Sequence, residues 1–164
     1  SFGTGHHETT RQMLHEILRA DMAGKDVLDM GCGTGILAIL AAMRGARHCT
    51  AIDVDEWCVR NSEENISLNG LQNIEVMLGD ASLLPSEPSF DIILANIHLN
   101  IIVSDMPVYV SCLRSGGLLL TSGFYRKDML RVEQRAAELG LTLLRAGEER
   151  EWCCAVFQKN DEMT

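Results

Sequence analysis

The feature that most constrains the fold of this chain is a glycine-rich turn between two apolar segments. Asp26 to Met30 is typical of a buried strand, Gly31 to Gly35 is the turn Gly-Cys-Gly-Thr-Gly, and Ile36 to Arg44 is typical of a buried helix. In an open α/β sheet such a turn lies at the carboxyl edge, where ligands bind. Its glycines let the backbone approach a ligand, and the amides at the helix start favour a carboxylate. A merely tight strand-to-helix connection has the same appearance, so the turn alone identifies no ligand.

Strand-like and helix-like segments alternate along the rest of the chain. We expect further helices over about residues 9–19, 55–69, 101–113 and 127–139, the first capped by Thr9 or Thr10. Further strands are expected at residues 48–53, 74–78, 90–95, 118–122, 141–144 and 153–157. This alternation predicts an α/β, doubly wound, Rossmann-like fold with a seven-stranded, mostly parallel sheet. The last two strands are expected to pair as an antiparallel hairpin at its edge.

Length and composition limit the possible functions. A chain of 164 residues with 46% hydrophobic residues predicts one domain over residues 1–164. A formal net charge of -9 argues against direct binding of nucleic acid. No apolar run reaches the ~18 residues of a membrane span, and no signal pattern opens the chain, so we expect a soluble cytoplasmic protein. Six cysteines without CxxC pairs predict reduced, mostly buried thiols.

The spacing of the glycines separates three kinds of nucleotide site. Ile36 occupies the third glycine position of the dinucleotide pattern GxGxxG, and the lysine of a phosphate-binding loop is missing. Asp53 ends the second expected strand, where an acidic side chain accepts hydrogen bonds from both ribose hydroxyls. Its alternative role is to cap the next helix, for which Asp55 is the better candidate. The pattern therefore favours a nucleoside without a pyrophosphate, contacted by Gly31, Gly33 and Asp53.

Polar residues also end the third and fourth expected strands. Asp80 is positioned to accept a hydrogen bond from an adenine amino group, with the amide of Ala81 against the ring, although a loop aspartate also forms turns. Asn96 is positioned to orient a substrate amine toward a methyl donor, or is a simple loop residue. Together with the glycine turn and Asp53, these residues predict S-adenosylmethionine as the ligand.

The opening segment, Phe2 to Thr10, is rich in glycine and polar residues. We expect it to form a loop that closes over a bound cofactor. The neighbouring His6 and His7 suggest a metal site, but no cysteine or further histidine lies at ligand spacing, and two surface histidines are the simpler interpretation. No metal is predicted. The chain begins inside this motif without an initiator Met, which suggests that an upstream domain is missing.

Five segments occur in a fixed order along nearly the whole chain: FGTGHHETT, LDMGCGTGILAI, AIDVDE, LANI and GGLLLTSGFY. In this order they resemble the catalytic domain of the PrmA-type ribosomal protein lysine methyltransferases, a class I methyltransferase family. The resemblance implies S-adenosylmethionine contacts at Thr10, Gly31, Asp53 and Asn96. It also implies a protein substrate, the eleventh protein of the large ribosomal subunit, at the base of the factor-binding stalk.

The chain also departs from this family. His98 and Asn100 stand where many members have small or apolar residues, and we expect the N-terminal substrate-recognition domain of the family to be absent. The expected reaction is an in-line attack by an amine on a sulfonium methyl group, with Asn96 orienting the amine. Three alternatives remain: methylation of a small molecule or another protein, a cofactor-binding module without turnover, and, least favoured, a dinucleotide oxidoreductase. The methylated amines, the number of methyl groups and the oligomeric state are not predicted.

Overall fold

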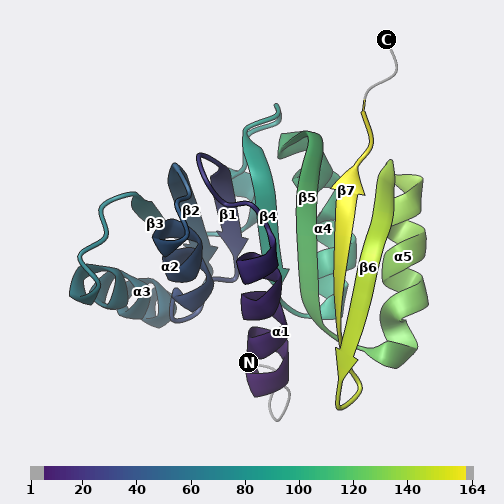
Figure 1. Cartoon of the computed structure of the whole chain (residues 1–164), viewed down its shortest axis with the longest axis horizontal. Helices are drawn as coiled ribbons and strands as arrows, with labels where there is room; N and C mark the ends of the chain where they lie inside the picture. The colour runs from purple at the N-terminus through teal and green to yellow at the C-terminus, as the bar shows by residue number, and fades with distance from the viewer. Residues whose placement is uncertain (1–5, 162–164) are drawn as a thin grey trace.

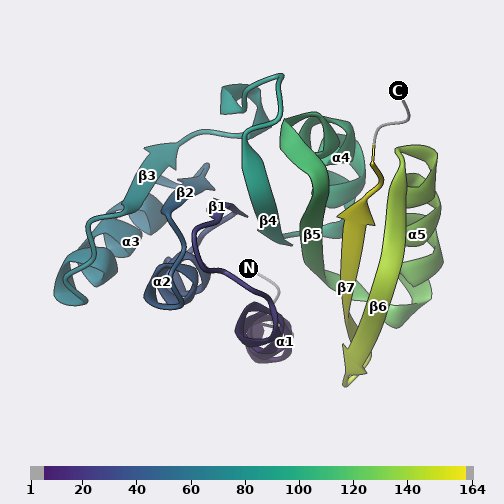
Figure 2. The same cartoon turned by 45° about the horizontal axis from the view of Figure 1, so that its top comes forward.

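A central sheet with helices on both faces organises the molecule (Figures 1 and 2). The computed structural model describes residues 6–161. Within them the strands are β1 (Asp26–Met30), β2 (His48–Asp53), β3 (Ile74–Leu78), β4 (Phe90–Asn96), β5 (Leu113–Tyr125), β6 (Leu141–Glu149) and β7 (Trp152–Lys159). The helices are α1 (His6–Arg19), α2 (Ile36–Met43), α3 (Glu56–Leu68), α4 (Leu99–Cys112) and α5 (Met129–Glu138), with short 3-10 helices η2 (Ala81–Leu83) and η3 (Arg126–Asp128).

The sheet confirms the predicted fold class. Its strand order is β3-β2-β1-β4-β5-β7-β6. The neighbouring strands from β3 to β5 pair in parallel, and β7 alone runs against its neighbours β5 and β6. The β6–β7 hairpin at the sheet edge was predicted. Because the chain moves outward in opposite directions from β1 and from β4, these two central strands form the switch point where an α/β sheet binds its ligand.

Three elements differ from the sequence prediction by more than two residues at a boundary, and the third of them, β6, extends to Glu149, five residues beyond its predicted end. Helix α1 begins at His6, so Thr9 and Thr10 lie inside the helix and do not cap it. Strand β5 begins at Leu113, five residues before the predicted start, because the glycine pair that suggested a strand boundary is absorbed in a bulge. Gly116 there has a φ of +78°, a left-handed conformation that glycine adopts without strain.

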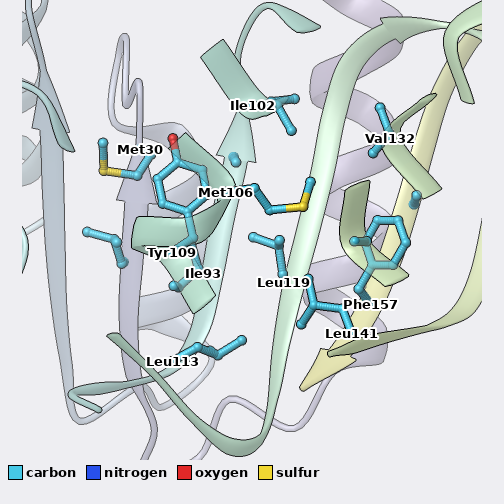
Figure 3. Close-up of a cluster of buried hydrophobic side chains, with 14 of the residues drawn as sticks. Met30, Ile93, Ile102, Met106, Tyr109, Leu113, Leu119, Val132, Leu141 and Phe157 are labelled. Atoms are coloured by element: carbon cyan, nitrogen blue, oxygen red, sulfur yellow. The ribbon is translucent and has the colours of Figure 1, made fainter. Parts of the chain in front are cut away.

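Each face of the sheet packs against its own helices. Met13 and Ile17 of α1 and Leu37 of α2 are buried on one face. On the opposite face α4 and α5 cover a second cluster, in which Met106 and Tyr109 pack with the labelled residues of Figure 3. All six cysteines are free, five are buried and Cys58 is partly buried, as predicted.

The topology brings several chain segments to one edge of the sheet. The carboxyl ends of β1 and β4, the N-terminal end of α1 and the β6–β7 turn all lie at the lower edge in Figure 1. Helix α1 contacts α2 as well as β4, β5, β6 and β7. It therefore reaches from the glycine turn to the hairpin. Within residues 6–161 no helix has the length and apolar character needed to cross a bilayer.

Candidate functional site

The glycine turn forms a hydrogen-bonded loop with left-handed glycines at the end of β1. Gly31, Gly33 and Gly35 all have positive φ values, of 73°, 55° and 84°. The amide of Gly31 donates a hydrogen bond to the carbonyl of Ile52 at 2.8 Å, which ties the loop to β2. A Cβ atom on Gly31 would lie 2.2 Å from Cγ2 of Ile97. Position 31 therefore requires glycine for both its conformation and its closeness to the segment after β4.

Asp53 connects the loops that follow β1 and β2. Its Oδ2 atom accepts a hydrogen bond from the amide of Gly33 at 2.9 Å, and its Oδ1 atom accepts one from the amide of Asp55 at 2.9 Å. Asp55 caps α3 by accepting from the amide of Trp57 at 2.8 Å. The capping role considered for Asp53 thus belongs to Asp55. Each carboxylate oxygen of Asp53 keeps a second lone pair for a ligand hydroxyl.

In the loop after β3, Asp80 forms a turn, which was the alternative role considered for it. Its Oδ1 atom accepts from the amide of Ser82 at 2.9 Å and so caps η2. Hydrogen bonds from the side chain and amide of Ser82 lower the pKa of this exposed carboxyl group. Ala81 is buried beside the core, and the amide of Gly79 donates to the carbonyl of Asp53 at 2.9 Å. The loop is thereby held next to Asp53, and adenine contacts of Asp80 and Ala81 stay predictions.

Asn96 is the last residue of β4 and presents an unused acceptor. Its Oδ1 atom is buried and has no hydrogen-bond partner among the described residues. Ser122 lies beside it on β5, but the hydroxyl of Ser122 donates to the carbonyl of Cys153 at 2.8 Å. A buried acceptor without a donor is costly, so a donor from a ligand would stabilise this position.

Helix α1 brings Thr10 to the glycine turn. Thr10 lines a cavity of about 410 Å³ together with His7, Arg11, Leu14, Thr34 and Ile36. The prediction of a loop up to Thr10 was wrong, since residues 6–10 are helical. Residues 2–5 of the predicted lid lie outside the described part of the chain, as does the side chain of His6. His7 is exposed, and the described residues contain no group of three or more side chains arranged to bind a metal.

Sequence reasoning missed Asp29, an acidic residue between the apolar Leu28 and Met30 in the strand before the glycine turn. Its side chain is fully buried, and neither oxygen accepts a hydrogen bond of normal geometry from the described residues. Burial raises the pKa of Asp29 to about 7, the amide of Ala38 acts in the opposite direction, and the charge of Asp53 raises the pKa further. The sequence signal was the charge itself, since an apolar strand gains nothing from a buried carboxyl group.

Comparison with known proteins matches nearly the whole chain to one family. The family model described as ribosomal protein L11 methyltransferase (PrmA) matches residues 1–160. Ribosomal protein L11 methyltransferase of Phocaeicola vulgatus is 51% identical over 157 residues, which cover 96% of this chain and 56% of the relative. The relative of the same name from Bacteroides fragilis is 52% identical with the same coverage. The chain thus spans about half the length of the curated relatives that it matches.

Solved structures show the same architecture. The ribosomal protein L11 methylase of Lactobacillus delbrueckii subsp. bulgaricus superposes with a TM-score of 0.88 at 29% identity, covering 95% of this chain and 81% of that one. Magnesium protoporphyrin IX methyltransferase from Synechocystis, solved with bound SAM, has a TM-score of 0.78 at 18% identity, covering 95% of this chain and 80% of that one. At that identity the second similarity concerns the fold alone.

Proposed function

The chain belongs to the ribosomal protein L11 methyltransferase family, and from this premise we propose that it binds S-adenosylmethionine and methylates amino groups of ribosomal protein L11, lysine side chains among them. The observation that supports this most is the meeting of three features at the switch point of the sheet: the left-handed glycine loop, the Asp53 carboxylate and the Asn96 oxygen, which has no partner in the described part of the chain. The name shared by the relatives supports the substrate.

The residues present fit this cofactor. Gly31 holds the loop in a left-handed conformation directly against Ile97, and the amides at the start of α2 are available to a carboxylate. In the proposed arrangement Gly31 and Gly33 hold the amino-acid part, Asp53 accepts from the ribose hydroxyls, and Asp80 and Ala81 contact the adenine. Thr10 covers the amino-acid part from α1. When bound, the cofactor supplies an electrophilic methyl group on a sulfonium.

Asn96 is the proposed catalytic residue. Its buried Oδ1 atom accepts a hydrogen bond from an N–H group of the attacking amine, which turns the nitrogen lone pair toward the methyl group. A lysine amine with a reference pKa of ~10.4 must lose a proton before it attacks, and desolvation at the site favours the neutral form. The work of the chain is therefore alignment and exclusion of water, and it needs no strong base.

Charge supports a basic partner more than a nucleic acid. A formal net charge of -9 attracts a positively charged ribosomal protein and repels a phosphate backbone. We accordingly infer a protein substrate at the base of the ribosomal stalk, with no direct role for nucleic acid. A substrate of this kind is consistent with the predicted cytoplasmic location.

Transfer of radiolabelled methyl groups tests the proposal. The protein is incubated with labelled S-adenosylmethionine and, in parallel, with purified L11, an unrelated lysine-rich protein and a mixture of small amines. The proposal expects label in L11 above both other acceptors. Preferential labelling of either other acceptor, or no labelling at all by a chain that binds the cofactor, would contradict the proposed substrate.

A further inference from the structure

Two acceptor atoms on one side of α1 are buried without partners. The Oε2 atom of Glu8 and the Oε1 atom of Gln12 have no hydrogen-bond partner among the described residues. Glu8 is only 6% exposed. Residues four apart lie one above the other on the same helix face, so the two side chains are neighbours. Neither atom takes part in the proposed cofactor contacts.

These side chains face away from the glycine turn. Gln12 donates through Nε2 to the carbonyl of Trp152 at 2.9 Å, and Trp152 pairs with Tyr125 at the carboxyl end of β5. The Oε1 atom of Glu8 lies 3.5 Å from a guanidinium nitrogen of Arg150 in the β6–β7 turn. Thr10, between them in sequence, lines the cavity beside α2 instead. Figures 1 and 2 show α1 passing over the sheet between these two sides.

Helix α1 divides the ligand-binding edge of the sheet into two parts, and only one of them is open to a methyl acceptor. The residues proposed to hold the cofactor follow β1, β2 and β3, and Asn96 at the end of β4 marks the reacting position. The acceptor half, formed by the carboxyl ends of β4 and β5, the start of β7 and the first turns of α1, is left for the other reactant. Glu8 and Gln12 belong to this acceptor half.

The chemistry of the two side chains specifies a cation. A buried carboxylate oxygen and a buried amide oxygen both require donors, and leaving them unpaired is costly. An alkylammonium group has three donors, no acceptor and a positive charge. The structure already seats one cation here, because Arg150 contacts Glu8 although the Arg150 side chain is 81% exposed. Such an exposed guanidinium is weakly held and easily exchanged for another cation.

We infer that Glu8 and Gln12 form a recognition site for an alkylammonium group of the methyl acceptor, with Arg150 as its stand-in when no acceptor is bound. A lysine amine is bound here in its protonated form, and it attacks at Asn96 only after it has lost its proton to solvent. This inference rests on the proposed methyl transfer, and it names the chemical class that the acceptor half recognises. Glu8 provides the charge, and Gln12, fixed by its bond to Trp152, provides a neutral acceptor one turn away.

A titration with a minimal acceptor tests the site directly. The probe is Nα-acetyl-lysine methylamide, added to the isotope-labelled protein with and without S-adenosylhomocysteine while NMR follows the side-chain amide of Gln12. The control ligand is Nα-acetyl-norleucine methylamide, which has a similar alkyl chain and no charge. The lysine derivative should move the Gln12 signals in a saturable manner, and the norleucine derivative should not. Equal responses to the two ligands, or none to the lysine derivative, would overturn the inference.

Variants separate this site from the cofactor site. Glu8→Gln should weaken binding of the lysine derivative about tenfold or more, because a charge-assisted hydrogen bond is lost. Glu149→Gln is the matched control. It removes a carboxylate of the β6–β7 hairpin that pairs with Arg11 of α1 at 3.0 Å, and it leaves the buried oxygen of Glu8 in place. Arg150→Asn should strengthen binding of the lysine derivative severalfold, because it removes the competing cation. Asparagine is chosen because it tolerates the φ of 49° at this position.

Two further outcomes are decisive. Unchanged lysine binding in folded Glu8→Gln would refute the site while leaving the methyl transfer proposal intact. Calorimetry with S-adenosylhomocysteine runs beside each titration, and its affinity should be the same for wild type and all three variants. Loss of cofactor affinity in Glu8→Gln would place Glu8 at the cofactor and also refute the site. If Glu8→Gln does not fold, the contrast between the lysine and norleucine derivatives in the wild type decides.

Discussion

The two halves of the ligand-binding edge differ in how their polar groups are satisfied. In the cofactor half, formed by the loops after β1, β2 and β3, Asp53 accepts from Gly33 and Asp55, and Gly79 donates to the carbonyl of Asp53. In the acceptor half, Oε2 of Glu8, Oε1 of Gln12 and Oδ1 of Asn96 are buried without hydrogen-bond partners among residues 6–161. The first half is held in shape by bonds within the chain, and the second is completed by what binds to it.

Asp29 is the exception in the cofactor half, and it gives the largest predicted effect. Burial raises its pKa from 3.8 to about 7, so between these pH values the folded chain keeps a proton that the unfolded chain has lost. The free energy of unfolding should therefore fall as pH rises from 3.8 to about 7, by up to about 4 kcal/mol, and this group adds no further change above that range. Urea unfolding at a series of pH values measures it.

Asp29→Asn is the matched variant, because the amide has a similar shape and does not titrate. The free energy of unfolding of this variant, relative to that of the wild type, should increase across the same pH interval. Parallel pH profiles for the two proteins would show that Asp29 is not a buried titrating group in solution.

The rigidity of the cofactor half is tested next by Gly31→Ala. The new Cβ would meet Ile97 at 2.2 Å in a backbone with a φ of +73°. Left-handed strain together with overpacking predicts about 100-fold weaker binding of S-adenosylhomocysteine, measured by calorimetry. Gly24→Ala is the control, since Gly24 has a φ of +72° with no atom within 4 Å. It should lower stability by about 1 to 2 kcal/mol without changing the affinity. Equal affinities for the two variants would mean that the loop adapts.

Asp53→Ala tests the bond that joins the loops. The loss of a charged acceptor for two ribose hydroxyls, worth ~1.5 to 3 kcal/mol, predicts a tenfold or greater rise in the dissociation constant of S-adenosylhomocysteine. Asp55→Ala is the control, because it removes the cap of α3 and should cost about 1 kcal/mol of stability while the affinity stays the same. An unchanged dissociation constant in folded Asp53→Ala would remove ribose binding from this residue.

Asn96→Ala gives the smallest expected effect and tests the acceptor half. Loss of one neutral hydrogen bond predicts a fall in kcat of about three- to tenfold, larger than the change in cofactor affinity. Ser122→Ala, at the neighbouring position on β5, removes a hydroxyl that is bonded within the chain and should leave kcat unchanged. Equal losses of kcat and cofactor affinity in Asn96→Ala would make Asn96 a cofactor ligand only.

Most of the site residues that could be predicted from the sequence belong to the cofactor half. The glycine loop, Asp53 and Asn96 were found because each ends or follows a strand whose apolar residues define its position. The bounds of β2 and β3 were predicted as observed, since both are short apolar runs flanked by turn residues.

The missed features depend on tertiary packing. Glu8 was counted as part of a flexible loop, and only its burial against the β6–β7 hairpin singles it out. The start of β5 was missed because the glycine pair was taken to precede the strand, whereas pairing with β4 accommodates it as a bulge within the strand. The burial of Asp29 likewise depends on the assembled sheet, in which β1 lies between β2 and β4.

Calorimetric titration with S-adenosylhomocysteine tests most directly whether this chain contains a complete cofactor site. The bonded loops of the cofactor half predict saturable binding at one molecule per chain, since the residues proposed for the contacts already lie together. Absence of binding by the folded protein would contradict the account.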